Sequence, residues 1–346
     1  MSDLSLSWVV GILVGSLMAT WLGVELFRQW SVKREFLDVP NERSSHSSPT
    51  PRGGGLVIVL TCLIGYVLIW LVFDVPFSAG YFAGAALVAT VSWIDDLVSL
   101  AFWKRLLAHF VAAGFLVADV GVWNEVAIPL SSSTLTLGPV IGAIVTVGWV
   151  VWLLNLYNFM DGIDGIAGTQ ALVAGAGWAA VAMILKQPGL LLFSAVFSAA
   201  SLGFLIHNWP PAKIFMGDVG SAFLGFTLAA LPLLAQPKAG AWQAVLPLIG
   251  VAFVWLFFFD TVFTLVRRII KGERFWEAHR GHIYQRMVID GLSHRFVTVF
   301  YGTAAAILSA LTVLFVQFGG IMVPLTISFL VLIAASQTYA AFRKTR

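Results

Sequence analysis

The sequence predicts an all-α integral membrane protein with about eleven transmembrane helices. Hydrophobic residues make up 59% of the 346-residue chain, charged residues make up 11%, and the mean hydropathy is +0.91. Soluble globular proteins carry about 25% charged residues, so this composition excludes a soluble enzyme held by a single anchor. The polar stretches are too short for a separate soluble domain, and residues 1–346 are therefore expected to form one polytopic domain.

Each expected span is a run of roughly 20 mostly apolar residues. The first has neither a basic leading region nor a small-residue cleavage site, so it is predicted to be a retained helix rather than a signal peptide. The third span is short and rich in Gly and Ala, and the ninth is long enough to tilt. In chain order the spans are expected at 6–27, 54–73, 77–94, 105–123, 137–154, 168–185, 189–206, 220–236, 243–266, 296–316 and 321–341.

Lysine and arginine decide the orientation of these spans. If the N-terminus lies outside, all but two of the 20 Lys and Arg residues fall on the inner side, and only Lys186 and Lys238 lie outside. The positive-inside rule therefore predicts a periplasmic N-terminus and a cytoplasmic C-terminus. The net charge of +3 then reflects basic cytoplasmic loops, so it is no evidence for nucleic-acid binding. The outer loop at 123–139 alternates weakly and predicts a small hairpin.

The polar motifs gather on the predicted inner side, each after an odd-numbered span. Carboxylates, amides, histidines and basic residues that converge on one face indicate a site rather than a scatter of solvated loops. In chain order the motifs are DVPNERSSHSSPTPRGGG, the pair DD at 95–96, NLYNFMDGIDGIAG from 155, FMGDVGS and EAHRGHIYQRM.

Acidic and amide residues are the first candidates for this site. Asp95 and Asp96 would point about 100° apart on a helix, so one can face a site while the other orients it. They also fit a solvated helix end, and Asp218, between two glycines, also fits a helix N-cap.

The central motif has a helical spacing. Asn155 and Asn158 are three residues apart, as are Asp161 and Asp164, and on a helix each pair would share a face. Ionisable groups between apolar spans are costly, so a cluster of this kind is seldom without function.

Hard oxygen ligands of this type suit Mg²⁺, which binds one or two carboxylates together with substrate phosphates. The single cysteine, Cys62, excludes a disulfide or a thiolate zinc site within the chain. His279, Arg280 and His282 form a basic cluster that favours phosphate binding. Acids for a metal and cations for phosphates, placed at a membrane surface, predict phosphoryl transfer between a lipid and a soluble phosphorylated substrate.

Taken together, the five motifs resemble the polyprenyl-phosphate N-acetylhexosamine-1-phosphate transferases, glycosyltransferase family 4, over residues 37–290. The PNERSSH and PTPRGGG segments look most like the branch that initiates O-antigen and lipopolysaccharide synthesis. The resemblance implies that undecaprenyl phosphate attacks the β-phosphate of a UDP-N-acetylhexosamine and that UMP leaves. It also implies a multi-pass enzyme of the bacterial inner membrane with its active site on the cytoplasmic face.

Roles for individual residues come from the same resemblance. It assigns the lipid phosphate and its deprotonation to Asp95 and Asp96, and a favoured phosphate contact to Arg105 over Lys104. The catalytic residues implied are Asp95, Asp96, Asp161 and His279; the substrate-binding residues are Asn155, Asp164, Arg105, Arg280 and His282; the metal ligands are Asn158 and Asp218. The implied cofactor is Mg²⁺, with Mn²⁺ as an alternative, and a homodimer stays open.

Two alternatives remain at this point. A phospho-MurNAc-pentapeptide translocase is similar, but that branch has three consecutive histidines where this chain has His279, Arg280, Gly281 and His282. A transporter would also carry intramembrane acids, but its polar groups would lie near the midplane, with an inverted repeat that this sequence lacks. The identity of the N-acetylhexosamine cannot be derived from the sequence, because one hydroxyl distinguishes the candidates.

Overall fold

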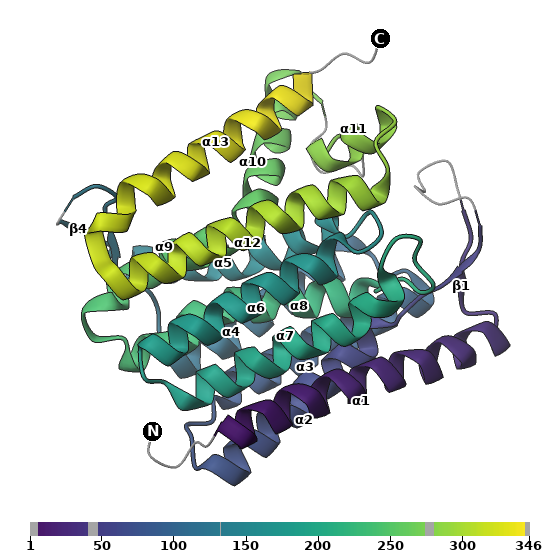
Figure 1. Cartoon of the computed structure of the whole chain (residues 1–346), viewed down its shortest axis with the longest axis horizontal. Helices are drawn as coiled ribbons and strands as arrows, with labels where there is room; N and C mark the ends of the chain where they lie inside the picture. The colour runs from purple at the N-terminus through teal and green to yellow at the C-terminus, as the bar shows by residue number, and fades with distance from the viewer. Residues whose placement is uncertain (1–5, 41–47, 132, 274–279, 343–346) are drawn as a thin grey trace.

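The computed structural model describes residues 6–40, 48–131, 133–273 and 280–342, and it is a bundle of helices that run roughly along one common direction (Figure 1). Two short antiparallel pairs, β1 (Leu37–Asp38) with β2 (Thr50–Pro51) and β3 (Glu125–Ala127) with β4 (Thr134–Thr136), are its described strands. The helices are α1 (Leu6–Lys33), α2 (Gly55–Phe73), α3 (Ala79–Val98), α4 (Phe102–Val120), α5 (Gly138–Met160), α6 (Ile166–Ile184), α7 (Pro188–Asn208), α8 (Asp218–Ala235), α9 (Leu246–Phe253), α10 (Trp255–Ile270), α11 (Ile283–Ile289), α12 (His294–Phe318) and α13 (Val323–Phe342).

Helices occupy all the expected spans, and the all-α membrane fold is confirmed. Among the described residues, eight helical stretches are long and apolar enough to cross a membrane, or nine if one bent pair counts as a span. Nine such stretches are two fewer than the eleven expected spans, and the difference has two causes. The α12–α13 region counts as one stretch, and α4 is not counted because it carries Lys104, Arg105 and Asp119. The β3–β4 pair confirms the hairpin expected at 123–139.

The ninth expected span, 243–266, is not one continuous helix. It breaks between α9 and α10, which differ in direction by 76°. Val254 has the non-helical dihedral angles φ −119° and ψ 16° at the break. The side chain of Gln170 in α6 donates to the Phe253 carbonyl at 2.7 Å, so the carbonyl freed by the break still has a partner. Irregular backbone at membrane depth is tolerated under that condition.

Helix α8 lies at the centre of the bundle, with α3, α5, α6 and α7 around it (Figure 1). In its apolar stretch 89% of the residues are buried, against 11% in α1 at the periphery. The first turns of α2 and α8 approach closely, because a Cβ on Gly55 would lie 2.4 Å from the Cα of Gly220. This contact fixes where α8 begins, and α8 begins with the predicted site residue Asp218.

Candidate functional site

The two adjacent aspartates at the end of α3 have different partners. Asp95 accepts hydrogen bonds from Arg105 Nη1 in α4 at 2.6 Å and from the Leu100 backbone N–H at 2.5 Å. Asp96 accepts from the backbone N–H groups of Asp218 at 3.1 Å and Val219 at 3.0 Å. Asp96 therefore caps the N-terminus of α8, where a carboxylate is stabilised by unpaired N–H groups and the helix dipole. The two carboxylates thus point to different partners, as expected for neighbours on a helix, and which of them faces a substrate stays a prediction.

The start of α8 requires glycine at the preceding position. Gly217 has φ +76°, and a Cβ there would lie 2.8 Å from Asp96 Oδ2. Because Gly217 has no side chain, the carboxylate can reach the first turn of α8. The alternative interpretation of Asp218 as a helix N-cap is therefore wrong. Gly217 occupies the N-cap position, and Asp218 is the first residue of the helix.

Arg105 connects two of the predicted carboxylates. Its Nη1 atom lies 2.6 Å from Asp95 Oδ2 and 3.0 Å from Asp218 Oδ2. Its neighbour Lys104 instead lies over the ring of Trp103, 5.6 Å from the centroid, on the exposed side of α4. The geometry therefore favours Arg105 over Lys104 as the basic residue of this site.

Asn158 joins the same group from α5. Its Oδ1 accepts a hydrogen bond from the Ser221 hydroxyl in the first turn of α8 at 2.6 Å. Asn155, one turn earlier, faces α4 instead. Its Nδ2 lies 2.7 Å from the Val151 carbonyl and 3.2 Å from His109 Nδ1. Both asparagines lie in the last turns of α5, which extends to Met160, and not in a loop that follows the span.

Asp161 follows α5 as its C-cap, where the helical spacing expected for Asp161 and Asp164 is broken. Burial first, and then the nearby charges of Asp218, Asp96 and Asp164, together raise the pKa of Asp161 from 3.8 to about 7. The carboxylates of α3, α8 and the α5–α6 loop therefore lie within electrostatic reach of one another.

Asp164 ties the α5–α6 loop to its neighbours. Its Oδ2 accepts from the Ala212 N–H at 3.1 Å, and its Oδ1 lies 3.4 Å from His294 Nδ1 at the start of α12. Its backbone carbonyl accepts from the Thr298 hydroxyl at 2.7 Å. These contacts give Asp164 a structural task whether or not it also binds substrate.

The PTPRGGG segment reaches the site from the N-terminal side. Arg52 donates to the Asp96 backbone carbonyl and stacks over Phe36 at 4.9 Å. The N–H groups of Gly54 and Gly55 donate to the carbonyls of Phe215 and Met216 at 3.0 and 2.9 Å. The glycine run therefore positions the α7–α8 loop, and these two amides are engaged by protein rather than by an anion.

The structure describes only part of the basic cluster formed by His279, Arg280 and His282, since His279 lies outside the described residues. Arg280 is partly buried. His282 is the N-cap of α11, is only 4% exposed, and lies with Nδ1 3.2 Å from Asp260 Oδ1.

Sequence reasoning missed two residues of this region. Asp260 is fully buried in α10, and its position within the apolar run WLFFFDTVFTL was a usable signal. His109, 5% exposed in α4, faces Asn155, and a lone histidine in an apolar helix gave no comparable signal.

Helix α11 packs directly onto the loop that carries Asp161. The Tyr284 hydroxyl donates to the Phe159 carbonyl at 2.9 Å. It lies so close to Gly162 that a Cβ there would be only 2.1 Å from the hydroxyl oxygen. The basic motif and the acidic cluster are therefore parts of one surface at one end of the bundle.

The donor chemistry of this surface fits a hard divalent cation. Asp95, Asp96, Asp161 and Asp218 bring four carboxylates together, and Arg105 pairs with two of them, which leaves excess negative charge. Within the described ranges, no three His, Cys, Asp or Glu side chains already have the arrangement of a metal site. Mg²⁺ needs only one or two carboxylates when substrate phosphates and water complete its shell, so the two findings are compatible.

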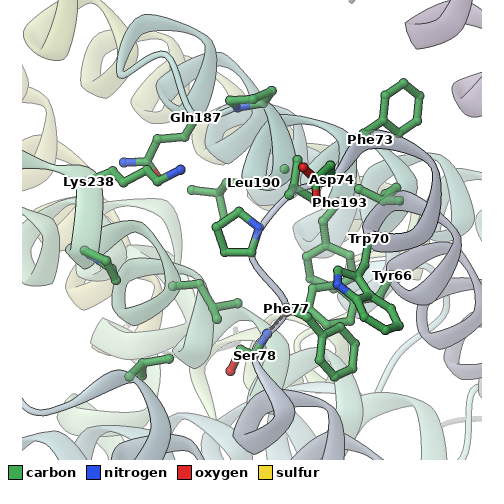
Figure 2. Close-up of a pocket in the computed structure, with 18 of the residues that line it drawn as sticks. Tyr66, Trp70, Phe73, Asp74, Phe77, Ser78, Gln187, Leu190, Phe193 and Lys238 are labelled. Carbon is green, nitrogen blue, oxygen red and sulfur yellow. Dashed lines mark hydrogen bonds between the residues drawn. The ribbon is translucent and has the colours of Figure 1, made fainter.

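A cavity of about 400 Å³ lies at the opposite ends of α2, α4 and α8 (Figure 2). Tyr66, Trp70 and Phe77 form an aromatic wall, and Asp74 and Lys238 lie at its rim. No residue predicted from the sequence to belong to the site lines this cavity. We therefore place the chemistry at the carboxylate end and not in the cavity.

Comparison with known proteins shows which family the chain resembles. The family model described as glycosyl transferase family 4 matches residues 78–236, which include the carboxylates of α3, the α5–α6 loop and α8. A probable undecaprenyl-phosphate N-acetylglucosaminyl 1-phosphate transferase of Bacillus subtilis is 29% identical over 303 residues, covering 85% of this chain and 81% of the relative.

Two further relatives extend the range of activities. A decaprenyl-phosphate N-acetylglucosaminephosphotransferase of Mycolicibacterium smegmatis is 30% identical over 287 residues, covering 74% of this chain and 69% of the relative. A phospho-N-acetylmuramoyl-pentapeptide-transferase of Halalkalibacterium halodurans is 28% identical over 332 residues, covering 90% and 95%.

Proposed function

The chain belongs to glycosyl transferase family 4, within the superfamily of polyprenyl-phosphate hexosamine-1-phosphate transferases, and from this premise we propose its reaction. It transfers N-acetylhexosamine-1-phosphate from a UDP-sugar to undecaprenyl phosphate and releases UMP, at the cytoplasmic face of a bacterial inner membrane. The observation that carries the proposal is the convergence of Asp95, Asp96, Asp161 and Asp218 with Arg105 at one end of the bundle.

The acceptor supplies its own nucleophile. A phosphate monoester has a second pKa near 6 and is mostly ionised at pH 7, so little deprotonation is required. An oxygen of the lipid phosphate attacks the β-phosphorus, the bond from that phosphorus to the bridging oxygen breaks, and UMP leaves with that oxygen. Arg105 offers the guanidinium that orients the lipid phosphate, and Asp95 holds Arg105 in place through the 2.6 Å contact.

Residues of α5 and α8 suit the donor side. Asn158 and Asp218 are the residues that would hold a divalent cation, which when bound supplies charge neutralisation to the diphosphate. Ser221 fixes the amide of Asn158 by its 2.6 Å hydrogen bond. Asp96 maintains the first turn of α8, and thus the place of Asp218, through the hydrogen bonds that it accepts from two backbone N–H groups.

Initiation of O-antigen or a similar surface glycan is the role we propose for the product, with an N-acetylhexosamine such as N-acetylglucosamine as the sugar. The alternative is a phospho-MurNAc-pentapeptide transfer, which the Halalkalibacterium halodurans relative favours by covering 90% of the chain. Membership of a transferase family argues against the transporter alternative.

An assay of the purified protein tests the proposal directly. It contains undecaprenyl phosphate, Mg²⁺ and one UDP-sugar at a time, and it measures released UMP. Release with UDP-N-acetylglucosamine or a related UDP-N-acetylhexosamine supports the proposal. Release only with UDP-MurNAc-pentapeptide supports the alternative, and release in the absence of the lipid phosphate contradicts both.

A further inference from the structure

A carboxylate inside the membrane region connects three helices near the site. Asp260 in α10 is fully buried and accepts hydrogen bonds from the Ile283 N–H at 2.8 Å, the Tyr284 N–H at 3.1 Å and the Tyr301 hydroxyl at 2.9 Å. A buried carboxylate without partners would be strongly destabilising. These donors from α11 and α12 compensate for its burial, and Asp260 thereby caps the first turn of α11.

The same carboxylate contacts the imidazole ring of His282. Asp260 Oδ1 lies 3.2 Å from His282 Nδ1, and both groups are buried. Two of the partners of Asp260 are backbone N–H groups, which can only donate, so the carboxylate acts as an acceptor. The side chain of His282 also accepts from the Gln285 N–H in a capping box, and the His282 N–H donates to Gln285 Oε1 at 3.3 Å. Contacts with α10 and α11 therefore fix the orientation of the His282 ring.

A second layer of contacts holds Asp260 itself. The Tyr301 hydroxyl that donates to Asp260 lies 3.2 Å from Gln337 Nε2, and that amide is also 3.2 Å from the Leu256 carbonyl. The chain of contacts therefore runs from α13 through α12 and α10 to α11. On the other side of α11, Tyr284 contacts the loop that carries Asp161.

We propose that Asp260 is a positioning residue, which fixes the orientation of the His282 ring and locks the first turn of α11 against the Asp161 loop. The part that concerns substrate rests on the proposed function, with His282 taken as one of the substrate-binding residues that the family resemblance implies. The part that concerns α11 stands on the hydrogen bonds alone, so the two can be tested separately.

Hydrogen–deuterium exchange tests the structural part without any substrate. Asp260→Asn should speed exchange in peptides that contain the Ile283 and Tyr284 amides, because their acceptor is weakened. Tyr301→Phe, which leaves the carboxylate in place, should speed it less. Thr261→Val is the matched control, because the Thr261 hydroxyl is buried on the same helix with no hydrogen-bond partner in the described structure. Unchanged exchange at 283–284 in both Asp260→Asn and Tyr301→Phe would overturn the proposal.

A double-mutant cycle tests the substrate part. Loss of a residue that orients a functional histidine costs about 10–100-fold, which we expect for Asp260→Asn in kcat/KM for the UDP-sugar. In a His282→Gln background the same substitution should cost no more than about threefold, because two residues that act through one another are not additive. The KM for the UDP-sugar should rise while the KM for undecaprenyl phosphate stays unchanged.

The outcomes separate the two hypotheses. An equal loss from Asp260→Asn in both backgrounds would show that Asp260 does not act through His282, which overturns the positioning role while the transfer reaction stands. If the wild-type protein releases UMP from no UDP-sugar, the proposed function fails, and the exchange experiment still decides whether Asp260 holds α11. Thr261→Val should match the wild type in both experiments.

Discussion

At the scale of single residues, Arg105 is the cation that connects the acid pair of α3 with the first residue of α8. Its Nη1 contacts Asp95 at 2.6 Å and Asp218 at 3.0 Å. Without it these carboxylates would repel each other, and the lipid phosphate would lose the cation between Asp95 and Asp218. Because one atom of Arg105 contacts two acids, substitution of Arg105 is the simplest test of this arrangement.

We expect Arg105→Ala to lower kcat/KM for undecaprenyl phosphate by about 10²–10³-fold, the range typical of a lost charge-stabilising donor. Lys104→Ala is the control, since Lys104 is exposed and lies over Trp103. It should stay within about twofold of the wild type, as surface substitutions usually do. The measurement is UMP release at varied lipid concentration. Equal losses in the two variants would contradict the assignment.

Asp161 gives the site a pH dependence. Its pKa is about 7 in the folded chain and 3.8 in the reference state, owing first to burial and then to the charges of Asp218, Asp96 and Asp164. Between these values the folded protein holds a proton that the unfolded chain has lost. Folding therefore becomes less favourable as pH rises from about 4 to 7, and the penalty is complete above that range.

Asp161→Asn removes this penalty. In the presence of a chelator, the variant should gain thermal stability over the wild type at pH 8 but little at pH 5. Mg²⁺ should stabilise the wild type more at pH 8 than at pH 5.5, because a cation held by Asn158 and Asp218 would favour the ionised form of the nearby Asp161. Thermal melts in detergent measure both effects. A stability difference that is the same at pH 5 and pH 8 would refute the role of this carboxylate.

At the scale of elements, the start of α8 is where the site is assembled. Gly55 of α2 packs against Gly220, Asp96 of α3 caps the helix, and Asn158 of α5 bonds to Ser221. Three helices thus determine the position of one helical turn. A change that moves the α2–α8 contact should disturb the site although it touches no candidate ligand.

Gly55→Ala tests this dependence. Its Cβ would lie 2.4 Å from the Gly220 Cα and 2.8 Å from the Met216 carbonyl oxygen, so backbone must move. We expect lower thermal stability and, in the folded fraction, lower UMP release. Gly148→Ala in α5 is the control, because nothing lies within 4 Å of its Cβ position. Glycine in a helix costs about 0.5–1 kcal/mol relative to alanine, so that variant should be equally or more stable. Full activity of Gly55→Ala would contradict the account.

Hydrophobic runs predicted the helices well because a span must satisfy its backbone internally. Hydrophobic runs could not predict the break at Val254, where the partner of the Phe253 carbonyl is Gln170, a residue far away in the sequence. The fifth span was also predicted to end too early, because Asn155 and Asn158 are polar. Both residues in fact continue α5. The partners of Asn155 and Asp260 come from α4, α11 and α12, and no local pattern indicates such contacts.

At the scale of the whole molecule, we expect the carboxylate end and the cavity end to lie on opposite sides of the membrane. The sole cysteine, Cys62, is fully buried, so the native chain serves as a background for cysteine labelling. Lys213, in the α7–α8 loop, and Lys238, at the rim of the cavity, are both exposed.

In inner-membrane vesicles of known orientation, Lys213→Cys should react with an impermeant maleimide from the cytoplasmic side only. Lys238→Cys should react from the periplasmic side only. This follows from the uneven distribution of lysine and arginine between the two sets of loops. Reaction of both from one side would overturn the proposed orientation while leaving the geometry of the site intact.

In the proposed reaction, Asn158 of α5 and Asp218 of α8 would hold a divalent cation between two phosphorylated substrates. The most direct test is Mg²⁺-dependent release of UMP by Asp218→Asn, with folding checked by its thermal melt. We expect a folded protein whose turnover falls by about 10²-fold or more, the scale of a lost charge-stabilising group. A folded variant that keeps the Mg²⁺-dependent turnover of the wild type would contradict this assignment.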